Sequence, residues 1–199
     1  MNAMGERFGE FVRETGETKV SVRIDLDGTG TASVDTGVGF ADHMLSLLSF
    51  WGRFDLMVSC RGDLEVDAHH SLEDVAISLG EAIRLALGDR AGIARVGVAK
   101  VPMDEALCEV VVDLSGRPYL VYRGGETLPP VIAGEERDLW REFFKSLAFT
   151  VRANLHIHYE YGQNGHHLVE AAFKALGLAL RRATTADGTR VPSTKGSLD

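Results

Sequence analysis

Four of the seven histidines lie in two copies of one short motif, His-His-x-x-Glu. The copies are residues 69–73 (HHSLE) and residues 166–170 (HHLVE). If each copy begins a helix, its Glu shares a face with the His residues three and four positions before it. Imidazole and carboxylate groups without a thiolate suit Mn²⁺, Fe²⁺ or Zn²⁺, and a Glu in each set is compatible with Mn²⁺. The motif predicts metal ligands at His69, His70, Glu73, His166, His167 and Glu170.

The two histidines of one pair can hardly chelate a single ion, because adjacent side chains on a helix diverge by about 100°. Two interpretations stay open: each His serves a different metal ion, or one binds metal and the other binds the substrate. A third interpretation is that a His-His pair only marks the start of a surface helix. One pair alone would favour that interpretation, whereas two pairs with Glu at the same place favour ligands.

Further ligands must come from other elements or other subunits, because such ions take about four to six ligands. His43 lies 26 residues before the first His-His pair, and Glu142 lies 24 residues before the second. These matched places make both residues natural additional ligands. His156 and His158 alternate with apolar residues in a strand-like segment, which favours a structural role for His158 and leaves His156 undecided.

The two motifs belong to an internal repeat. Residues 69–83 and 166–180 are identical at six of 15 positions, and each segment follows an expected helix and strand. Chance similarity between amphipathic helices would not place both His residues and the Glu in register. We therefore expect a single α+β domain over residues 1–199, with repeat halves at about 1–91 and 92–185 and a tail at 186–199. Each half is expected to form a small, mostly antiparallel sheet covered on one face by two helices.

Hydrophobic periodicity predicts the elements that position these residues. Residues 1–16 are polar and read as an edge or arm, residues 18–26 and 31–35 as a hairpin, and Asp42 as the cap of a helix that ends at Gly52. The remaining expectations are a connector at 63–68, a loop at 126–136, strands at 54–60, 94–101, 107–114, 119–122 and 155–161, and helices at 69–87, 138–151 and 166–183.

Composition narrows the class of protein. The chain has 199 residues and a formal net charge of −8, with no block of Lys or Arg, which argues against a nucleic-acid partner. No apolar run approaches the length of a membrane span, and the first residues do not resemble a secretory signal. Two cysteines, Cys60 and Cys108, argue against a disulfide scaffold. We expect a cytoplasmic protein without a membrane or nucleic-acid partner.

Several long segments resemble the imidazoleglycerol-phosphate dehydratases of histidine biosynthesis. These segments are TGVGFADHML (36–45), GDLEVDAHHSLEDVAISLGEAI (62–83), VPMDEALCEVVVDLSGRPYL (101–120), GQNGHHLVEAAFKALGLALRRA (162–183) and VPSTKGSL (191–198). The resemblance implies a hydro-lyase with a duplicated fold of the ribosomal S5 domain 2-like kind and two Mn²⁺ ions per subunit. It also implies a homo-oligomeric shell of 24 subunits with sites between subunits.

The resemblance also implies roles for individual residues. Glu17 corresponds to an acidic residue that contacts the substrate and is a candidate acid or base. Arg95, Arg117, Ser193, Thr194 and Lys195 correspond to positions that bind the substrate phosphate. The implied metal ligands are His43, His69, His70, Glu73, Glu142, His166, His167 and Glu170, and all of these except Glu142 are expected, with Glu17, to serve catalysis.

The expected reaction removes water from imidazole-glycerol phosphate to give imidazole-acetol phosphate. An unaided carboxylate cannot easily remove the carbon-bound proton next to the imidazole ring. Metal ions on the ring nitrogens would stabilise an imidazolate, which expels the hydroxyl through a diazafulvene-like intermediate. In this hypothesis Glu17 moves the carbon-bound proton.

The chain departs from the family pattern at two places. Glu142 stands where some relatives carry His, and Trp51 stands where some relatives carry His before a glycine. Three other readings are weighed against the dehydratase: a phosphatase that uses the DLDGT segment at 25–29, a metal-storing shell protein, and a relative with another substrate. Gly30 after that segment argues against the phosphatase, and the phosphate-type residues argue against storage.

Overall fold

The structure is a computed structural model that describes residues 7–196 and residue 198. Four strands and two helices make up the first half of the chain. They are β1 (Phe8–Glu14), β2 (Thr18–Asp25), β3 (Ala32–Asp35), α1 (Gly39–Gly52), β4 (Asp55–Gly62) and α2 (His69–Leu87).

The second half repeats this order with one insertion before its first helix. The repeated elements are β5 (Val96–Met103), β6 (Ala106–Asp113), β7 (Tyr119–Arg123), α3 (Arg137–Val151), β10 (Asn154–Tyr161) and α4 (Gly165–Thr184). The insertion contains a short 3₁₀ turn, η1 (Gly125–Thr127), and a two-stranded ribbon of β8 (Val131–Ile132) and β9 (Glu135–Glu136).

The two sheets have the same topology. Their strand orders are β1-β2-β4-β3 and β5-β6-β10-β7. In each sheet the first three strands of that order run antiparallel, and the last strand runs parallel to its neighbour. The fold is therefore the expected α+β class, with two duplicated halves that each carry a mostly antiparallel sheet and two helices.

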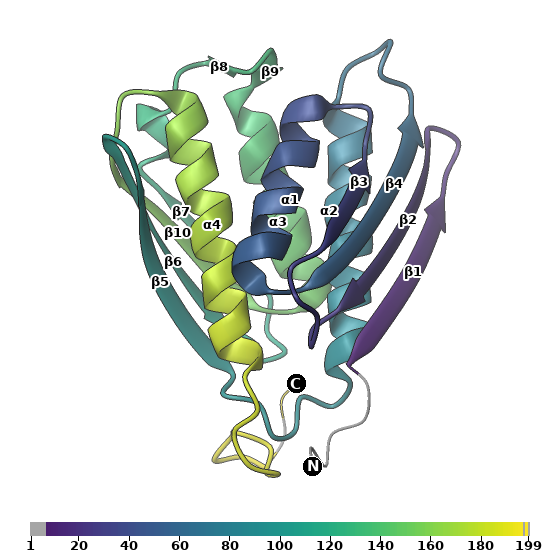
Figure 1. Cartoon of the computed structure of the whole chain (residues 1–199), viewed down its shortest axis with the longest axis vertical. Coiled ribbons are helices and arrows are strands. Elements are labelled where there is room, and N and C mark those ends of the chain that lie inside the picture. The colour runs from purple at the N-terminus through teal and green to yellow at the C-terminus, as the bar shows by residue number, and fades with distance from the viewer. Residues whose placement is uncertain (1–6, 197, 199) are drawn as a thin grey trace.

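The four long helices lie between the two sheets (Figure 1). Alternation of apolar residues turns one face of each sheet inward; in β2, for example, Val20, Val22 and Ile24 are fully buried. The halves are packed together by their helices, because α1 lies against α4 and α2 lies against α3. None of the helices in the described part of the chain is long and apolar enough to cross a membrane.

Two glycines allow the close helix contacts that join the halves. A Cβ on Gly177 of α4 would lie 2.6 Å from the carbonyl oxygen of Leu48 in α1. A Cβ on Gly80 of α2 would lie 3.2 Å from the carbonyl oxygen of Leu147 in α3. These glycines occupy the same place of the repeat, so the two helix pairs are related by the duplication.

Two expectations about the first half were wrong. The segments at 18–26 and 31–35 do not form a hairpin: β2 pairs with β1 and β4, whereas β3 runs parallel to β4. Residues 8–14 supply the hairpin partner of β2 and the edge strand of the sheet. Alternation within each segment predicted the strands, but it does not say which strand lies beside which.

Asp42 is the second correction, because it lies inside the first turn of α1 rather than capping the helix. The helix begins at Gly39, and Val38 is its N-cap residue. The Asp42 carboxylate accepts hydrogen bonds from the backbone N–H and the hydroxyl of Thr36, at 2.8 and 2.6 Å. The side chain therefore fixes the loop before the helix.

Candidate active site

One set of the expected ligands is assembled across the two halves. His43 comes from α1, and His166 and Glu170 come from the first turns of α4. Each offers a ligand atom, and these atoms lie within 4.8 Å of one another; no other such set of three occurs among the residues that the structure describes. The Nε2 atoms of His166 and His43 lie 3.2 and 3.5 Å from Oε2 of Glu170.

The other carboxylate oxygen of Glu170 is held by a lysine. Lys174, one helical turn further along α4, places its Nζ 2.6 Å from Oε1 of Glu170. Burial raises the pKa of Glu170, but Lys174 and His43 outweigh burial, and the pKa lies below its usual value. Glu170 is therefore ionised, with Oε2 directed toward the two imidazoles and Oε1 bound to the ammonium group.

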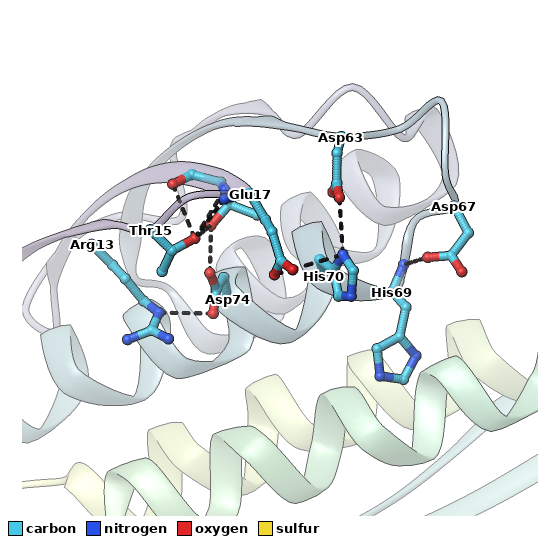
Figure 2. Close-up of polar contacts among 9 residues, drawn as sticks. Arg13, Thr15, Glu17, Asp63, Asp67, His69, His70 and Asp74 are labelled. Atoms are coloured by element: carbon cyan, nitrogen blue, oxygen red, sulfur yellow. Dashed lines mark hydrogen bonds and ion pairs between the residues drawn. The ribbon is translucent and has the colours of Figure 1, made fainter.

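The equivalent set, which takes Glu142 from α3 and His69 and Glu73 from α2, is not assembled in this way. Glu142 of α3 forms ion pairs with Arg141 at 2.9 Å and with Lys145 at 2.7 Å. Glu73 accepts a hydrogen bond from the Ser146 hydroxyl at 3.3 Å. The ring of His69 points away from the neighbouring carboxylates in Figure 2. The departure at Glu142 thus belongs to the ligand set whose members are apart.

His70 lies between two carboxylates that come from different loops (Figure 2). Its Nδ1 is 3.0 Å from Oδ2 of Asp63 and 3.7 Å from Oε2 of Glu17. The hydrogen bond with Asp63 raises the pKa of His70 above its usual value. Glu17 is exposed, so its carboxylate is open to a substrate beside His70.

A polar network fixes the short turn that carries Glu17 (Figure 2). The Thr15 hydroxyl accepts the backbone N–H groups of Glu17 and Thr18 at 3.2 and 3.0 Å. The Thr18 hydroxyl in turn donates to Asp74 of α2, and Nε of Arg13 donates to the same carboxylate at 2.7 Å. The turn is thereby tied to the helix that carries His70.

His167 has a carboxylate partner that the sequence analysis did not identify. Nδ1 of His167 lies 2.6 Å from Oε2 of Glu105, which is in the turn between β5 and β6. This hydrogen bond, helped by the N–H of Asn164, lowers the pKa of Glu105 to about 2 and raises that of His167. Glu105 is therefore a carboxylate at all ordinary pH values.

The residues expected to bind phosphate line one open pocket of about 750 Å³. Arg95, Arg117 and Lys195 supply positive charge, and the pocket also includes Ser193 and Thr194. Arg95 forms a bidentate ion pair with Asp113 at 2.6 and 3.0 Å, and it also donates a hydrogen bond to the carbonyl oxygen of Pro192 at 2.8 Å. Arg95 thus also holds the C-terminal tail in place.

The pocket and the histidines lie at opposite ends of α4. The backbone N–H of Arg95 donates to the carbonyl of Ala183, near the end of the helix, whereas His166 is in its first turn. A rise of 1.5 Å per residue puts about 25 Å between these two positions. Within one chain, therefore, a small molecule cannot contact the histidines and the pocket together.

Several residues near the site escaped the sequence analysis, and two had a usable signal. Lys174 is four positions after Glu170, the spacing of an ion pair on a helix. Glu105 has the same place in the repeat as Glu17, because both precede the second strand of a half by one residue. Asp63 and Asp74 had no such signal, since their partners come from distant segments.

The remaining candidates lie elsewhere. Trp51 packs beside Gly177, and Nζ of Lys174 lies 5.9 Å from the centre of its ring. His156 and His158 line a small hollow with Glu109 and Arg123 on their own sheet. In the DLDGT segment, the Asp25 carboxylate accepts the backbone N–H of Asp27, so it stabilises a turn.

Fold and site together define a duplicated α+β enzyme with imidazoles and carboxylates at one end and a pocket lined by basic side chains at the other. The family model for imidazoleglycerol-phosphate dehydratase matches residues 36–180. The chain belongs to this family, whose members are dehydratases and therefore hydro-lyases.

Individual relatives agree with this assignment over nearly the whole chain. The imidazoleglycerol-phosphate dehydratase of Solidesulfovibrio magneticus is 76% identical over 197 residues, covering 98% of this chain and 100% of the relative. That of Thermobifida fusca is 52% identical, covering 96% and 99%. The crystal structure from Pyrococcus furiosus is similar with a TM-score of 0.83 at 40% identity, covering 94% of this chain and 100% of that one. The structure from Staphylococcus aureus gives 0.80 at 34%, covering 90% and 99%.

Proposed function

We propose that this chain removes water from imidazole-glycerol phosphate to form imidazole-acetol phosphate, a step of histidine biosynthesis, and that it needs Mn²⁺. The reaction takes one carbon-bound proton and one hydroxyl group from the substrate, passing through a diazafulvene-like form. The enol that remains becomes the ketone when a proton moves to carbon. The observation that carries the proposal is the convergence of His43, His166 and Glu170 in a chain of this family.

The donor set fits the proposed metal. Two imidazole nitrogens and one carboxylate oxygen within 4.8 Å can bind the same ion, and mixed nitrogen and oxygen ligands without sulfur suit Mn²⁺. When bound, Mn²⁺ would supply Lewis acidity that favours negative charge on the imidazole ring of the substrate. The other proposed ligands are His69, His70, Glu73, Glu142 and His167, and the proposed stoichiometry is two Mn²⁺ ions per subunit.

Glu17 is the proposed acid or base. Its carboxylate is exposed, lies 3.7 Å from His70, and is held by a turn whose backbone N–H groups are bound to Thr15. A carboxylate so placed can take the carbon-bound proton of a substrate whose imidazole lies beside His70.

Arg95, Arg117, Ser193, Thr194 and Lys195 are proposed to bind the phosphate group. The two guanidinium groups and the ammonium group supply local positive charge in a chain of net charge −8. Because about 25 Å of α4 separates this pocket from His166, we propose that one copy supplies the phosphate pocket and another the histidines. The 24-subunit shell is the proposed assembly.

A cytoplasmic location is also proposed. Cys60 of β4 and Cys108 of β6 are buried free thiols in different sheets, so the fold is stable in a reducing compartment. Burial raises the pKa of the Cys60 thiol, which keeps it in the unreactive neutral form.

The test is an assay of the purified chain after removal of metal and again after addition of Mn²⁺. Formation of imidazole-acetol phosphate only with Mn²⁺ supports the substrate and the metal together. If the chain binds metal but forms no product, the proposed metal site is supported and the proposed substrate is wrong. The assembly is tested by mixing Lys195→Ala with His166→Ala: if sites are shared between copies, mixed assemblies regain activity that neither variant has alone.

A further inference from the structure

One carboxylate is repeated in the two halves but does not have the same partner in each. Glu17 and Glu105 are 88 residues apart, as are Gly9 and Gly97 in the strands that precede them. Each Glu lies in the turn between the first two strands of its half, and each faces the second histidine of a His-His pair. The two halves therefore carry the same pair of groups at equivalent places.

In the second half this carboxylate is fully engaged. Oε2 of Glu105 lies 2.6 Å from Nδ1 of His167. Oε1 of Glu105 accepts the backbone N–H groups of Gln163 and Asn164 at 3.2 and 2.8 Å. Both oxygens thus hold the start of α4, and the ring of His167 is fixed through Nδ1.

In the first half a different carboxylate, that of Asp63, contacts Nδ1 of the second histidine. Nδ1 of His70 is 3.0 Å from Oδ2 of Asp63, whereas the Oε2 atom of Glu17 is 3.7 Å away, beyond hydrogen-bond length. The other oxygen of Asp63 is buried and has no hydrogen-bond partner within the described chain. A carboxylate that has one oxygen buried and a single side-chain partner for the other is directed at that partner.

Asp63 lies beside His70 because the connector between β4 and α2 is longer than the equivalent connector between β10 and α4. Four residues, 63–66, separate the end of β4 from Asp67, whereas two residues, 162–163, separate the end of β10 from Asn164. Asp67 and Asn164 are equivalent, since each accepts the backbone N–H of the first histidine, at 2.7 and 2.9 Å. The two extra residues bring a carboxylate to His70 that the second half lacks.

We infer that Asp63 and Glu105 are positioning residues that orient His70 and His167 through Nδ1, and that Asp63 thereby leaves Glu17 free to transfer protons. A neutral imidazole that donates Nδ1–H to a carboxylate presents Nε2 as its ligand nitrogen. The inference rests on the proposed metal-dependent function. It explains why two carboxylates of equal place in the repeat differ in role.

The test compares Asp63→Ala, Glu105→Ala and the exposed control Glu65→Gln. Mn²⁺ affinity is measured by equilibrium titration of the metal-stripped assembly, alongside its thermal unfolding midpoint and turnover. Loss of a hydrogen bond behind a ligating His weakens metal binding by about 10- to 100-fold. We expect that loss in both alanine variants and not in the control, with a small change in the unfolding midpoint.

Turnover at saturating Mn²⁺ separates the two roles. Glu105→Ala should recover most of its turnover, whereas Asp63→Ala should not, because Glu17 becomes the partner of His70. Asp63→Asn and Glu105→Gln retain an acceptor oxygen and should regain part of the affinity; they also serve if an alanine variant does not fold. Unchanged Mn²⁺ affinity with a lowered unfolding midpoint would overturn the inference. A wild-type protein that binds no Mn²⁺ would instead overturn the proposed function.

Discussion

The two halves of this chain hold their first hairpin turn by different means. Beneath the turn of Glu17 lies a network of two hydroxyls, a guanidinium and a carboxylate, and at the equivalent places of the second half every side chain is apolar. The equivalent pairs are Arg13 and Val101, Thr15 and Met103, Thr18 and Ala106, and Asp74 and Ala171.

This difference between the two turns indicates that Glu17 needs an exact position. A buried ion pair stabilises a fold weakly, because desolvation opposes the attraction between the charges. Apolar packing serves the second half, where Glu105 is held by its own hydrogen bonds to His167 and to the backbone. Glu17 lacks such bonds of its own, so the network beneath it sets its place.

The two equivalent sets of metal ligands, each drawn from both halves, also differ. His43, His166 and Glu170 are together, whereas Glu142 is bound by Arg141 and Lys145 instead of facing His69 and Glu73. The first half thus contributes a placed acid or base, whereas the placed ligands come from α1 of the first half and α4 of the second. The variants below test this division, from the largest expected effect to the smallest.

Glu17→Gln should lower turnover by about 100- to 10,000-fold, the range expected when a general acid or base is lost. Its Mn²⁺ content should stay that of the wild type, because Glu17 lies 3.7 Å from His70 and is hydrogen-bonded to neither histidine motif. Steady-state kinetics and metal analysis of the same preparation check both points. Loss of metal in this variant would contradict the assignment of Glu17.

Glu170→Gln should weaken Mn²⁺ binding more than Glu142→Gln does. Glu170 faces two imidazoles. Its replacement should therefore lower Mn²⁺ affinity by about 10- to 100-fold or more, the range seen when a residue behind a metal ligand is lost. Glu142 must first leave Arg141 and Lys145, so its contribution to affinity should be smaller. Titration with Mn²⁺ compares the two variants; equal losses would mean that both ligand sets assemble equivalent sites when metal binds.

Asp74→Ala should lower the free energy of unfolding by about 1–3 kcal/mol, because it leaves Arg13 and the Thr18 hydroxyl without their shared acceptor. Chemical denaturation measures this loss. The matched control replaces three residues with those of the second half, as Arg13→Val, Thr18→Ala and Asp74→Ala together. Removing all partners should restore stability but not turnover; restored turnover would show that the network does not position Glu17.

Gly80→Ala and Gly177→Ala test the part of the scaffold that the halves share. An added methyl group should cost about 1 kcal/mol or more at each place, the low end for overpacking. Gly177→Ala should cost slightly more, since its Cβ would lie 2.6 Å from a backbone oxygen, whereas the nearest atom at Gly80 is the Thr150 Cβ at 2.8 Å. Thermal unfolding midpoints of the two variants give the comparison. A large difference would show that the two helix contacts are not energetically equivalent.

Much of the fold was predictable from local pattern. The helix at 69–87 was predicted with its observed bounds, and the long second-half strands and helices differ from prediction by a few residues at most. The loop expected at 126–136 was wrong in part, because it contains the short paired strands β8 and β9. The hairpin at 18–26 and 31–35 failed because the strand order brings β4 between β2 and β3. Apolar alternation fixes which face of a strand is buried, but the neighbour of that strand depends on the later chain.

The candidate site divides in a similar way. Sequence singled out the His-His-x-x-Glu motifs, because spacing on a helix is local and the repeat makes it visible twice. Sequence also named the residues of the Arg95 pocket, through their resemblance to a family. It did not find Asp63 or Glu105, whose distances to His70 and His167 depend on how connectors fold over helix ends.

By itself, then, the sequence determined the duplication, the long helices and strands and the chemical types available, since these follow from periodicity and from residue identity. Tertiary structure alone decided that His43 meets His166, that Asp63 and not Glu17 holds His70, and that α4 separates the pocket from the histidines. The reason is physical: ligand and hydrogen-bond geometry acts over about 3 Å, whereas the residues concerned are tens of positions apart and meet only when the helices pack.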